Sequence, residues 1–151
     1  MNYKDKGLNS FQSGYNSFEE LTDICTSFWD SENISLETGL EGEVAFLLSH
    51  HFLLRGENIR LAELSDFYSV YLENEGSLGR TQAFYFRRDK GKTLSAGEIV
   101  HHGMLRSKDP RICGVRALAF YLFYRFQIKN EPLPDFSRSE NWYDLKVIFK
   151  I

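Results

Sequence analysis

The sequence predicts an α+β fold, mostly helical, in which a small antiparallel sheet separates two groups of helices. Apolar residues recur at helical intervals over 18–29 and 38–54, as they do on the buried side of a helix. Between 67 and 104, aromatic and β-branched residues alternate with polar ones and are interrupted by glycine-containing turns. Helical spacing returns over 114–127, and this order of elements is typical of an α+β domain.

Capping signals indicate where the first helices begin and end. Ser17 precedes the first helix, and Glu20 follows at the capping-box spacing. Gly56 lies where the second helix should end, and a short helical turn is expected over 59–64. We expect the polar residues 1–16 to form an arm and residues 17–151 to form a single domain.

The sheet is expected to contain three strands, over 67–73, 81–88 and 98–104. Turn sequences at 74–79 and 89–92 separate these strands. After the 114–127 helix, Pro132 and Pro134 interrupt the chain, and a last, shorter helix is expected over 141–149.

Composition argues against several classes of protein. The 151 residues, 42% of them hydrophobic, are enough for a packed core. No apolar run is long enough for a membrane span, and the N-terminus lacks the apolar stretch of a secretory signal. Cys25 and Cys113 lie in apolar helical patterns, so we interpret them as reduced core thiols of an intracellular protein. We expect no cofactor, no metal and no small-molecule substrate.

The charges are distributed unevenly along the chain. The formal net charge is −3, but residues 1–50 alone carry −7. Between Arg80 and Arg116, nine Lys and Arg residues oppose three acidic ones, which gives +6 over 37 residues. A local basic segment matters more for phosphate binding than the total charge, so the distribution favours a nucleic-acid-binding protein.

Arg55 is the strongest single candidate for a phosphate contact. It lies between an apolar helix and a short helical turn, so its guanidinium and the amides of the turn would together suit a phosphate. The alternative is that Arg55 pairs with Glu57, Glu63 or Asp66 and orders the loop. The sequence supports both interpretations equally.

A second basic cluster surrounds the turn after the middle strand. Its members are Arg87, Arg88, Lys90 and Lys92. Lysines at a hairpin tip can reach the phosphates of a groove, although a charged, solvated turn would show the same pattern. The pairs His50-His51 and His101-His102 do not predict a zinc site, because adjacent side chains point in different directions.

Aromatic residues near the C-terminus allow two interpretations. Trp142 and Tyr143 could stack on bases, but aromatic residues beside a helix start are more often packing anchors. The apolar side of the 114–127 helix is expected to be core. This leaves Arg116, Tyr121, Tyr124 and Arg125 on its other side as candidate contacts. No nucleophile elbow and no distinctive pair of carboxylates indicates a hydrolytic enzyme.

Several blocks of the sequence, in order, resemble the central DNA-binding domain (domain 2) of the large subunit of the fungal centromere-binding complex. The blocks are HFLLRGEN at 51–58, ELSD at 63–66, GKT at 91–93, RSKDP at 106–110 and ALAFYLFYR at 117–125. A closing segment over 131–146, with PDF at 134–136 and WYD at 142–144, resembles the same family. The likeness covers about residues 7–149.

The resemblance implies a nuclear protein that binds double-stranded DNA mainly through its backbone, with kinetochore assembly at the centromere as one use. The family is similar in fold to tyrosine recombinases and Crypton-type mobile elements, so a partial recombinase-like catalytic-domain fold is expected. By this analogy, Arg55 resembles the first catalytic arginine of recombinases, and Lys90 or Lys92 their hairpin lysine. The His-x-x-Arg box and the helix with a nucleophilic tyrosine do not follow Trp142, so we expect no enzymatic activity.

Two alternatives remain open. One is a subunit or remnant of a Crypton-type recombinase whose missing residues come from another chain. The other is a protein-interaction module without DNA contact, in which the acidic first fifty residues dock a partner. We also expect the fold to be truncated on its C-terminal side, in which case exposed core on the 114–127 helix would favour a homodimer.

The expected partner is double-stranded DNA, and the expected DNA-binding side chains lie between positions 55 and 111. They are Arg55, Arg60, Arg88, Lys90, Lys92, His102, Arg106, Lys108 and Arg111.

Overall fold

The computed structural model describes residues 17–30, 32, 34–76, 79–89 and 97–148. The predicted arm over 1–16, together with Lys90 and Lys92, lies outside these residues. The helices are α2 (Phe18–Asp30), α3 (Leu36–Phe52), α4 (Gly56–Leu61) and α5 (Gly114–Phe123), which continues as a π-helix, η3 (Tyr124–Ile128). The strands are β1 (Phe67–Glu73), β2 (Arg80–Arg88) and β3 (Val100–Leu105). Short 3-10 turns are η1 (Leu64–Asp66), η2 (Pro110–Ile112) and η4 (Ser139–Asn141). The predicted α+β class is confirmed.

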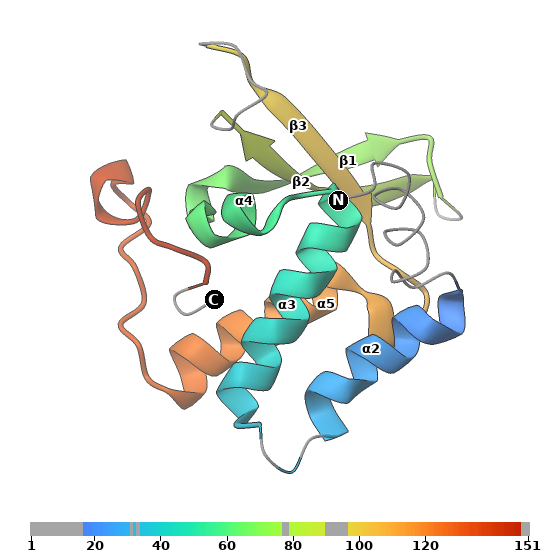
Figure 1. Cartoon of the computed structure of the whole chain (residues 1–151). Coiled ribbons are helices and arrows are strands. Elements are labelled where there is room, and N and C mark those ends of the chain that lie inside the picture. The colour runs from blue at the N-terminus through green and yellow to red at the C-terminus, as the bar shows by residue number, and fades with distance from the viewer. Residues whose placement is uncertain (1–16, 31, 33, 77–78, 90–96, 149–151) are drawn as a thin grey trace, which may run out of the picture.

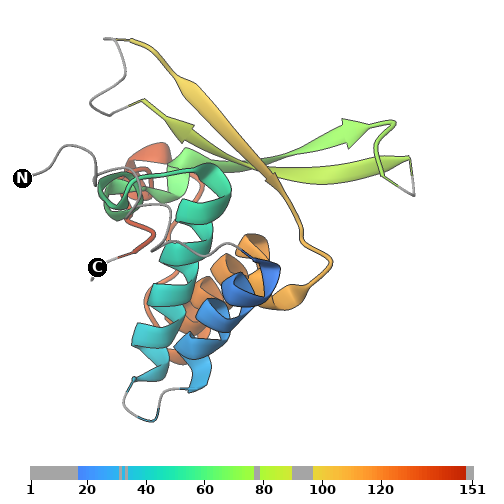
Figure 2. The same ribbon diagram turned by 45° about the vertical axis from the view of Figure 1, so that its right-hand side comes forward.

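The three strands form an antiparallel sheet that lies across one end of the helices (Figure 1). In its register Phe67, Phe86 and His102 are neighbours across β1, β2 and β3. The face that carries them packs on the helices, with the Phe52 ring 5.8 Å from Phe86 and 6.3 Å from Phe67. Figure 2 shows the opposite face turned away from the helices.

Helix α3 is the centre of the helical layer and packs against both α2 and α5 (Figure 1). Ser35 caps its start by accepting a hydrogen bond from the Thr38 amide. Val44, Leu47 and Leu48 of α3 are fully buried. Helix α3 is buried on several sides, which is the expected position for a helix without a strong polar side. Among the described residues, no helix is long and apolar enough to cross a bilayer.

Glycines on α3 allow α2 to approach closely. A Cβ atom on Gly39 would lie 2.4 Å from the carbonyl oxygen of Phe28, and one on Gly42 would lie 2.7 Å from the Phe28 ring. The first contact is with backbone, which cannot move aside as a side chain can. The α2–α3 crossing therefore depends on the absence of a side chain at Gly39.

The predicted last helix over 141–149 is wrong. The chain forms the turn η4 and then an extended segment that pairs with residues 62–64. The Leu64 amide donates to the Leu145 carbonyl at 2.8 Å, and the Val147 amide donates to the Ala62 carbonyl at 3.0 Å. This pairing satisfies the backbone and buries Val147 and Ile148, whose β-branched side chains favour extended conformations.

Gly39→Ala is expected to lower the free energy of unfolding by about 1–3 kcal/mol, because the added methyl overlaps the Phe28 carbonyl. Urea denaturation followed by circular dichroism would measure the change. Gly56→Ala is the control, since its Cβ would meet no atom closer than 4.0 Å, and it should leave stability equal or raise it by up to about 1 kcal/mol. Equal effects of the two substitutions would contradict the packing account.

Candidate nucleic-acid interface

Arg55 lies immediately before α4, with an exposed side chain that makes no hydrogen bond or ion pair with the described part of the chain. Two of the carboxylates that could have paired with it are engaged elsewhere. Glu63 accepts a 2.6 Å contact from Lys146, and Asp66 accepts from the Glu63 amide at 2.9 Å. Arg60, on α4, is also exposed and has no ionic partner among the described residues. The loop-ordering ion pair proposed as an alternative for Arg55 is therefore not observed.

Arg88 and His102 lie on the helix-facing side of the sheet, on neighbouring strands. Both side chains are half-buried, and Arg88 Nε and His102 Nε2 are buried without a hydrogen-bond partner in the described structure. Burial, and then the positive charge of Arg88, lower the pKa of His102 below its ordinary value of 6.5. His102 is therefore neutral at pH 7 in the free protein.

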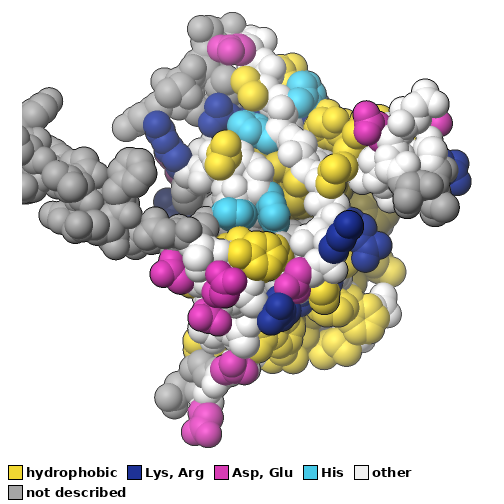
Figure 3. All heavy atoms as spheres, turned by 90° about the vertical axis from the view of Figure 1, so that its right-hand side faces the viewer, with side chains coloured by type: hydrophobic (Ala, Val, Ile, Leu, Met, Phe, Trp, Pro, Cys, Tyr) yellow, Lys and Arg dark blue, Asp and Glu magenta, His cyan; other side chains and the backbone are white. Residues whose placement is uncertain are grey.

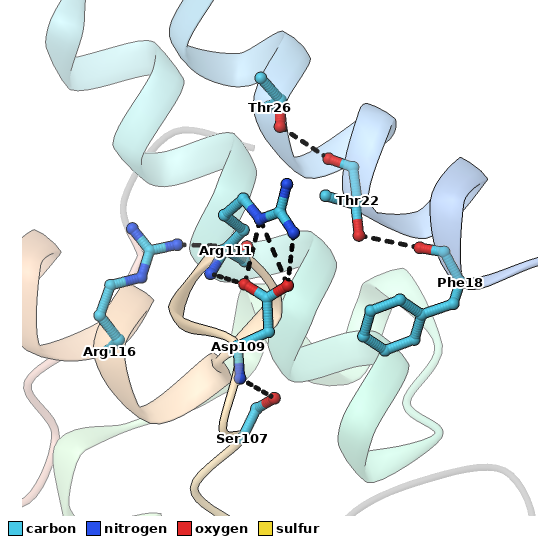
Figure 4. A network of polar contacts seen from close by, with 7 residues as sticks. All are labelled: Phe18, Thr22, Thr26, Ser107, Asp109, Arg111 and Arg116. Carbon is cyan, nitrogen blue, oxygen red and sulfur yellow. Dashed lines mark hydrogen bonds and ion pairs between the residues drawn. The ribbon is translucent and has the colours of Figure 1, made fainter.

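The connection from β3 to α5 carries three predicted cations, of which one is neutralised. Arg106 and Lys108 are exposed and have no carboxylate partner among the described residues. Arg111, by contrast, holds Asp109 with two guanidinium nitrogens, Nη2 at 2.7 Å and Nε at 3.1 Å (Figure 4). These hydrogen bonds also hold the pKa of the Asp109 carboxyl below its ordinary value.

Three of the candidate contacts on the 114–127 helix are buried or paired, and this corrects the prediction. Arg116 forms an ion pair with the buried carboxylate of Glu43. Tyr121 is buried and donates to Glu41 at 2.9 Å, and burial raises its pKa. Arg125 is 2% exposed and donates to Glu131 at 2.9 Å. The sequence pattern missed these partners because they are acidic residues on α3, or lie beyond the helix.

The fourth candidate contact on this helix, Tyr124, is half-buried and packs against the core. Near the C-terminus, Trp142 packs against Phe136, with ring centroids 5.3 Å apart, as expected for a packing anchor. The exposed Tyr143 ring lies 4.8 Å from the Trp142 ring.

The cations of the described residues divide into two groups by position along the chain. Each one from Arg111 to Lys146 has a carboxylate oxygen within 4.0 Å; these are Arg111, Arg116, Arg125, Lys129, Arg138 and Lys146. Upstream, Arg87 meets Asp66 at 4.0 Å. The others have no carboxylate partner within the described ranges; these are Arg55, Arg60, Arg80, Arg88, Arg106 and Lys108. Arg80 was not among the predicted contacts, although the basic segment begins with it.

Apart from Arg80, which lies at the far end of the β1–β2 hairpin, the unpaired cations lie on the elements around the end of α3 that meets the sheet. In Figures 1 and 2, α4 lies on one side of this end and the β3–η2 connection on the other. The structure therefore brings Arg88 and His102 together on the sheet, and Arg106 and Lys108 together on the β3–η2 connection. Arg55 and Arg60 lie at α4, on the other side of α3 from this connection. Figure 3 shows Lys and Arg side chains on both sides of a central group of histidines, with acidic side chains lower on the same face.

The histidines form no metal site in the described structure. The His50 and His51 rings lie 5.1 Å apart, and His51 Nε2 lies 2.9 Å from the Ile112 carbonyl oxygen. No three side chains of the types that ligate metals come together among the described residues.

Arg88→Gln is expected to raise the pKa of His102 toward 6.5, because a neighbouring positive charge is removed while the burial remains. An NMR titration of the His102 ring protons would measure the change. Arg80→Gln, at the other end of the same strand, is the control and should leave the pKa of His102 unchanged. A shift of the His102 pKa in Arg80→Gln but not in Arg88→Gln would contradict the conclusion that the Arg88 charge lowers this pKa.

Comparison with known proteins identifies the family. No curated protein matches the chain significantly. Residues 7–150 match the family described as centromere DNA-binding protein complex CBF3 subunit, domain 2. Since the match covers nearly the whole chain, this protein belongs to the family of CBF3 subunit domain 2.

Proposed function

We propose that this chain binds double-stranded DNA through the phosphate backbone, using the cations between Arg55 and Lys108 that have no carboxylate partner. The observation that carries the proposal is the division of the cations: within the described ranges, those from Arg111 to Lys146 are already paired. An unpaired, exposed cation can replace a counterion on DNA, whereas a paired one must first give up its carboxylate. The printed description of the family, which names a centromere DNA-binding complex, supports the same ligand.

The position of these cations supports contact with a duplex. Helix α4, which contains Arg60 and follows Arg55, lies on one side of the end of α3, and the β3–η2 connection, which contains Arg106 and Lys108, lies on the other (Figures 1 and 2). Contacts to phosphate fix the position of a protein on DNA without reading its sequence. We therefore propose a backbone-binding surface that spans this end of α3, with Lys90 and Lys92 as further contacts. A nuclear location and a role at the centromere and kinetochore belong to this proposal.

Arg55→Ala and Arg106→Ala are each expected to weaken duplex binding. Each should also make the negative slope of log affinity against log salt less steep, by about 0.9 per lost phosphate contact. The reason is that each variant releases one counterion fewer on binding. Fluorescence anisotropy of a labelled duplex over a salt series would measure both quantities.

Lys129→Ala is the matched control. Lys129 already pairs with Glu37 at 2.7 Å, at the opposite end of α3, so its loss should leave the salt slope unchanged. A wild-type affinity that does not depend on salt, or an equal loss of slope in all three variants, would contradict the proposal.

The finer part of the proposal is a recombinase-like fold without catalysis. Arg55 is available as a phosphate ligand, but Tyr143 lies in the C-terminal segment, where its carbonyl accepts a 2.9 Å hydrogen bond from Ser65. Nothing in this position activates the Tyr143 hydroxyl, for which the described residues provide no hydrogen-bond partner.

Incubation with a nicked suicide duplex is therefore expected to give no covalent protein–DNA adduct on a denaturing gel. An active tyrosine recombinase serves as the positive control for the substrate. An adduct that disappears in Tyr143→Phe would instead identify an enzyme and overturn the non-catalytic part of the proposal.

A further inference from the structure

A pocket of about 400 Å³ lies where α2, α3, η2 and α5 meet. Its walls include Trp29, Pro110 and Phe120, and its buried parts include Cys25 and the ion pair of Glu43 with Arg116. The volume lies within the range of sites that hold small molecules or single large side chains. Pro110 and Arg111 of the pocket follow the candidate DNA contacts Arg106 and Lys108 in the chain, but none of the unpaired cations that the proposed function uses lines the pocket.

The pocket presents apolar walls around a neutralised charge pair. The Arg116 guanidinium carbon lies 5.9 Å from the Trp29 ring and 5.4 Å from the Phe120 ring, so the same side chain positions both rings. Trp29 is 44% exposed and Phe120 is 50% exposed, which leaves part of each ring open to a ligand. Burial, and then Glu43, raise the pKa of the Cys25 thiol to about 11, so this part of the pocket is uncharged at pH 7. An uncharged, apolar group fits these surroundings best.

The charges around the pocket are mainly acidic on the α2 side. Helix α2 contributes Glu19, Glu20, Asp23 and Asp30 and contains no Lys or Arg. Arg111, which also lines the pocket, is already held by Asp109 at 2.7 Å. Figure 3 shows acidic side chains beside a group of exposed hydrophobic side chains in the lower part of this face. The acidic residues of α2 beside the pocket attract positive charge and repel the phosphates of nucleic acid.

We propose that this pocket binds a protein segment that inserts one large apolar side chain between Trp29 and Phe120 and places Lys or Arg residues beside the acidic face of α2. The apolar walls would bind the large side chain, and the acidic residues of α2 would bind the Lys or Arg residues next to it. An aromatic anchor in a preformed pocket is the usual source of most binding energy in such contacts. The protein would then bind DNA through its unpaired cations and a basic protein segment through this pocket.

Other occupants fit less well. A nucleobase carries several donors and acceptors on its edge, and most of them would lose water against Trp29, Pro110 and Phe120 without gaining a partner. A charged small molecule would have to compete with the pairing of Glu43 and Arg116. Self-association through this surface would instead place a second copy of the chain in the pocket, and it would appear as a dimer in sedimentation.

The test uses a synthetic peptide with a central tryptophan and two lysines on each side, measured by isothermal titration calorimetry against the whole chain. Binding is expected, and it should weaken as salt is raised. Replacing the central tryptophan by alanine, or all four lysines by glutamates, should each lower the affinity at least about tenfold. Trp29→Ala and Phe120→Ala, on two different helices, should each cause a comparable loss.

Leu133→Ala is the control variant, because this side chain is 64% exposed and does not line the pocket; it should bind as the wild type does. Circular dichroism would verify that each variant keeps its fold. Equal affinity for the alanine peptide, or no effect of Trp29→Ala and Phe120→Ala, would overturn the proposal. Sedimentation showing a dimer that Trp29→Ala dissociates would also overturn it, in favour of a second copy of the chain as the occupant.

Discussion

The contact between α3 and α5 depends on acidic side chains of α3 that meet polar partners across the helix interface. Glu43 pairs with Arg116, Glu41 accepts from Tyr121, and Glu37 pairs with Lys129. Glu41 and Glu43 are buried, and a buried carboxylate without a partner would cost several kcal/mol. The two helices can therefore pack in this register only with these partners in place. The apolar core around Val44 and Leu118 forms in the same interface.

This requirement decides which cations are available for a ligand. Arg116 pairs with Glu43, Lys129 with Glu37, and Lys146 with Glu63, so none of these cations is free to bind phosphate. Asp66, which could have held Arg55, instead accepts from the amide of Glu63. Glu63 and Asp66 are thus engaged in the fold, and Arg55 remains exposed. The net charge of −3 conceals this division, because most acidic side chains lie away from the unpaired cations or are used internally.

Local patterns predicted most elements, and long-range contacts account for the failures. The first strand was predicted over the residues that form it, Phe67–Glu73, because alternation is a property of adjacent positions. The ends of α2 and of the middle strand were predicted to within one residue. The exposure of Arg116 and Tyr121 was predicted wrongly, since their partners Glu43 and Glu41 lie 73 and 80 positions away. No local spacing signals a contact of that length.

The C-terminal segment shows how such contacts join distant parts of the chain. Arg125 Nη1 donates to the carbonyls of Lys146 at 2.9 Å and Val147 at 3.0 Å, which fixes this segment against α5. Lys146 in turn donates to the carbonyl of Leu61 at 2.8 Å and to the carboxylate of Glu63. The turn that follows Arg55 and Arg60 is therefore held in place from α5 through the C-terminal segment. The C-terminal segment, whose aromatic residues suggested a base-stacking loop, thus holds the candidate DNA-binding turn in place through these hydrogen bonds. A helix over 141–149 could not make these contacts.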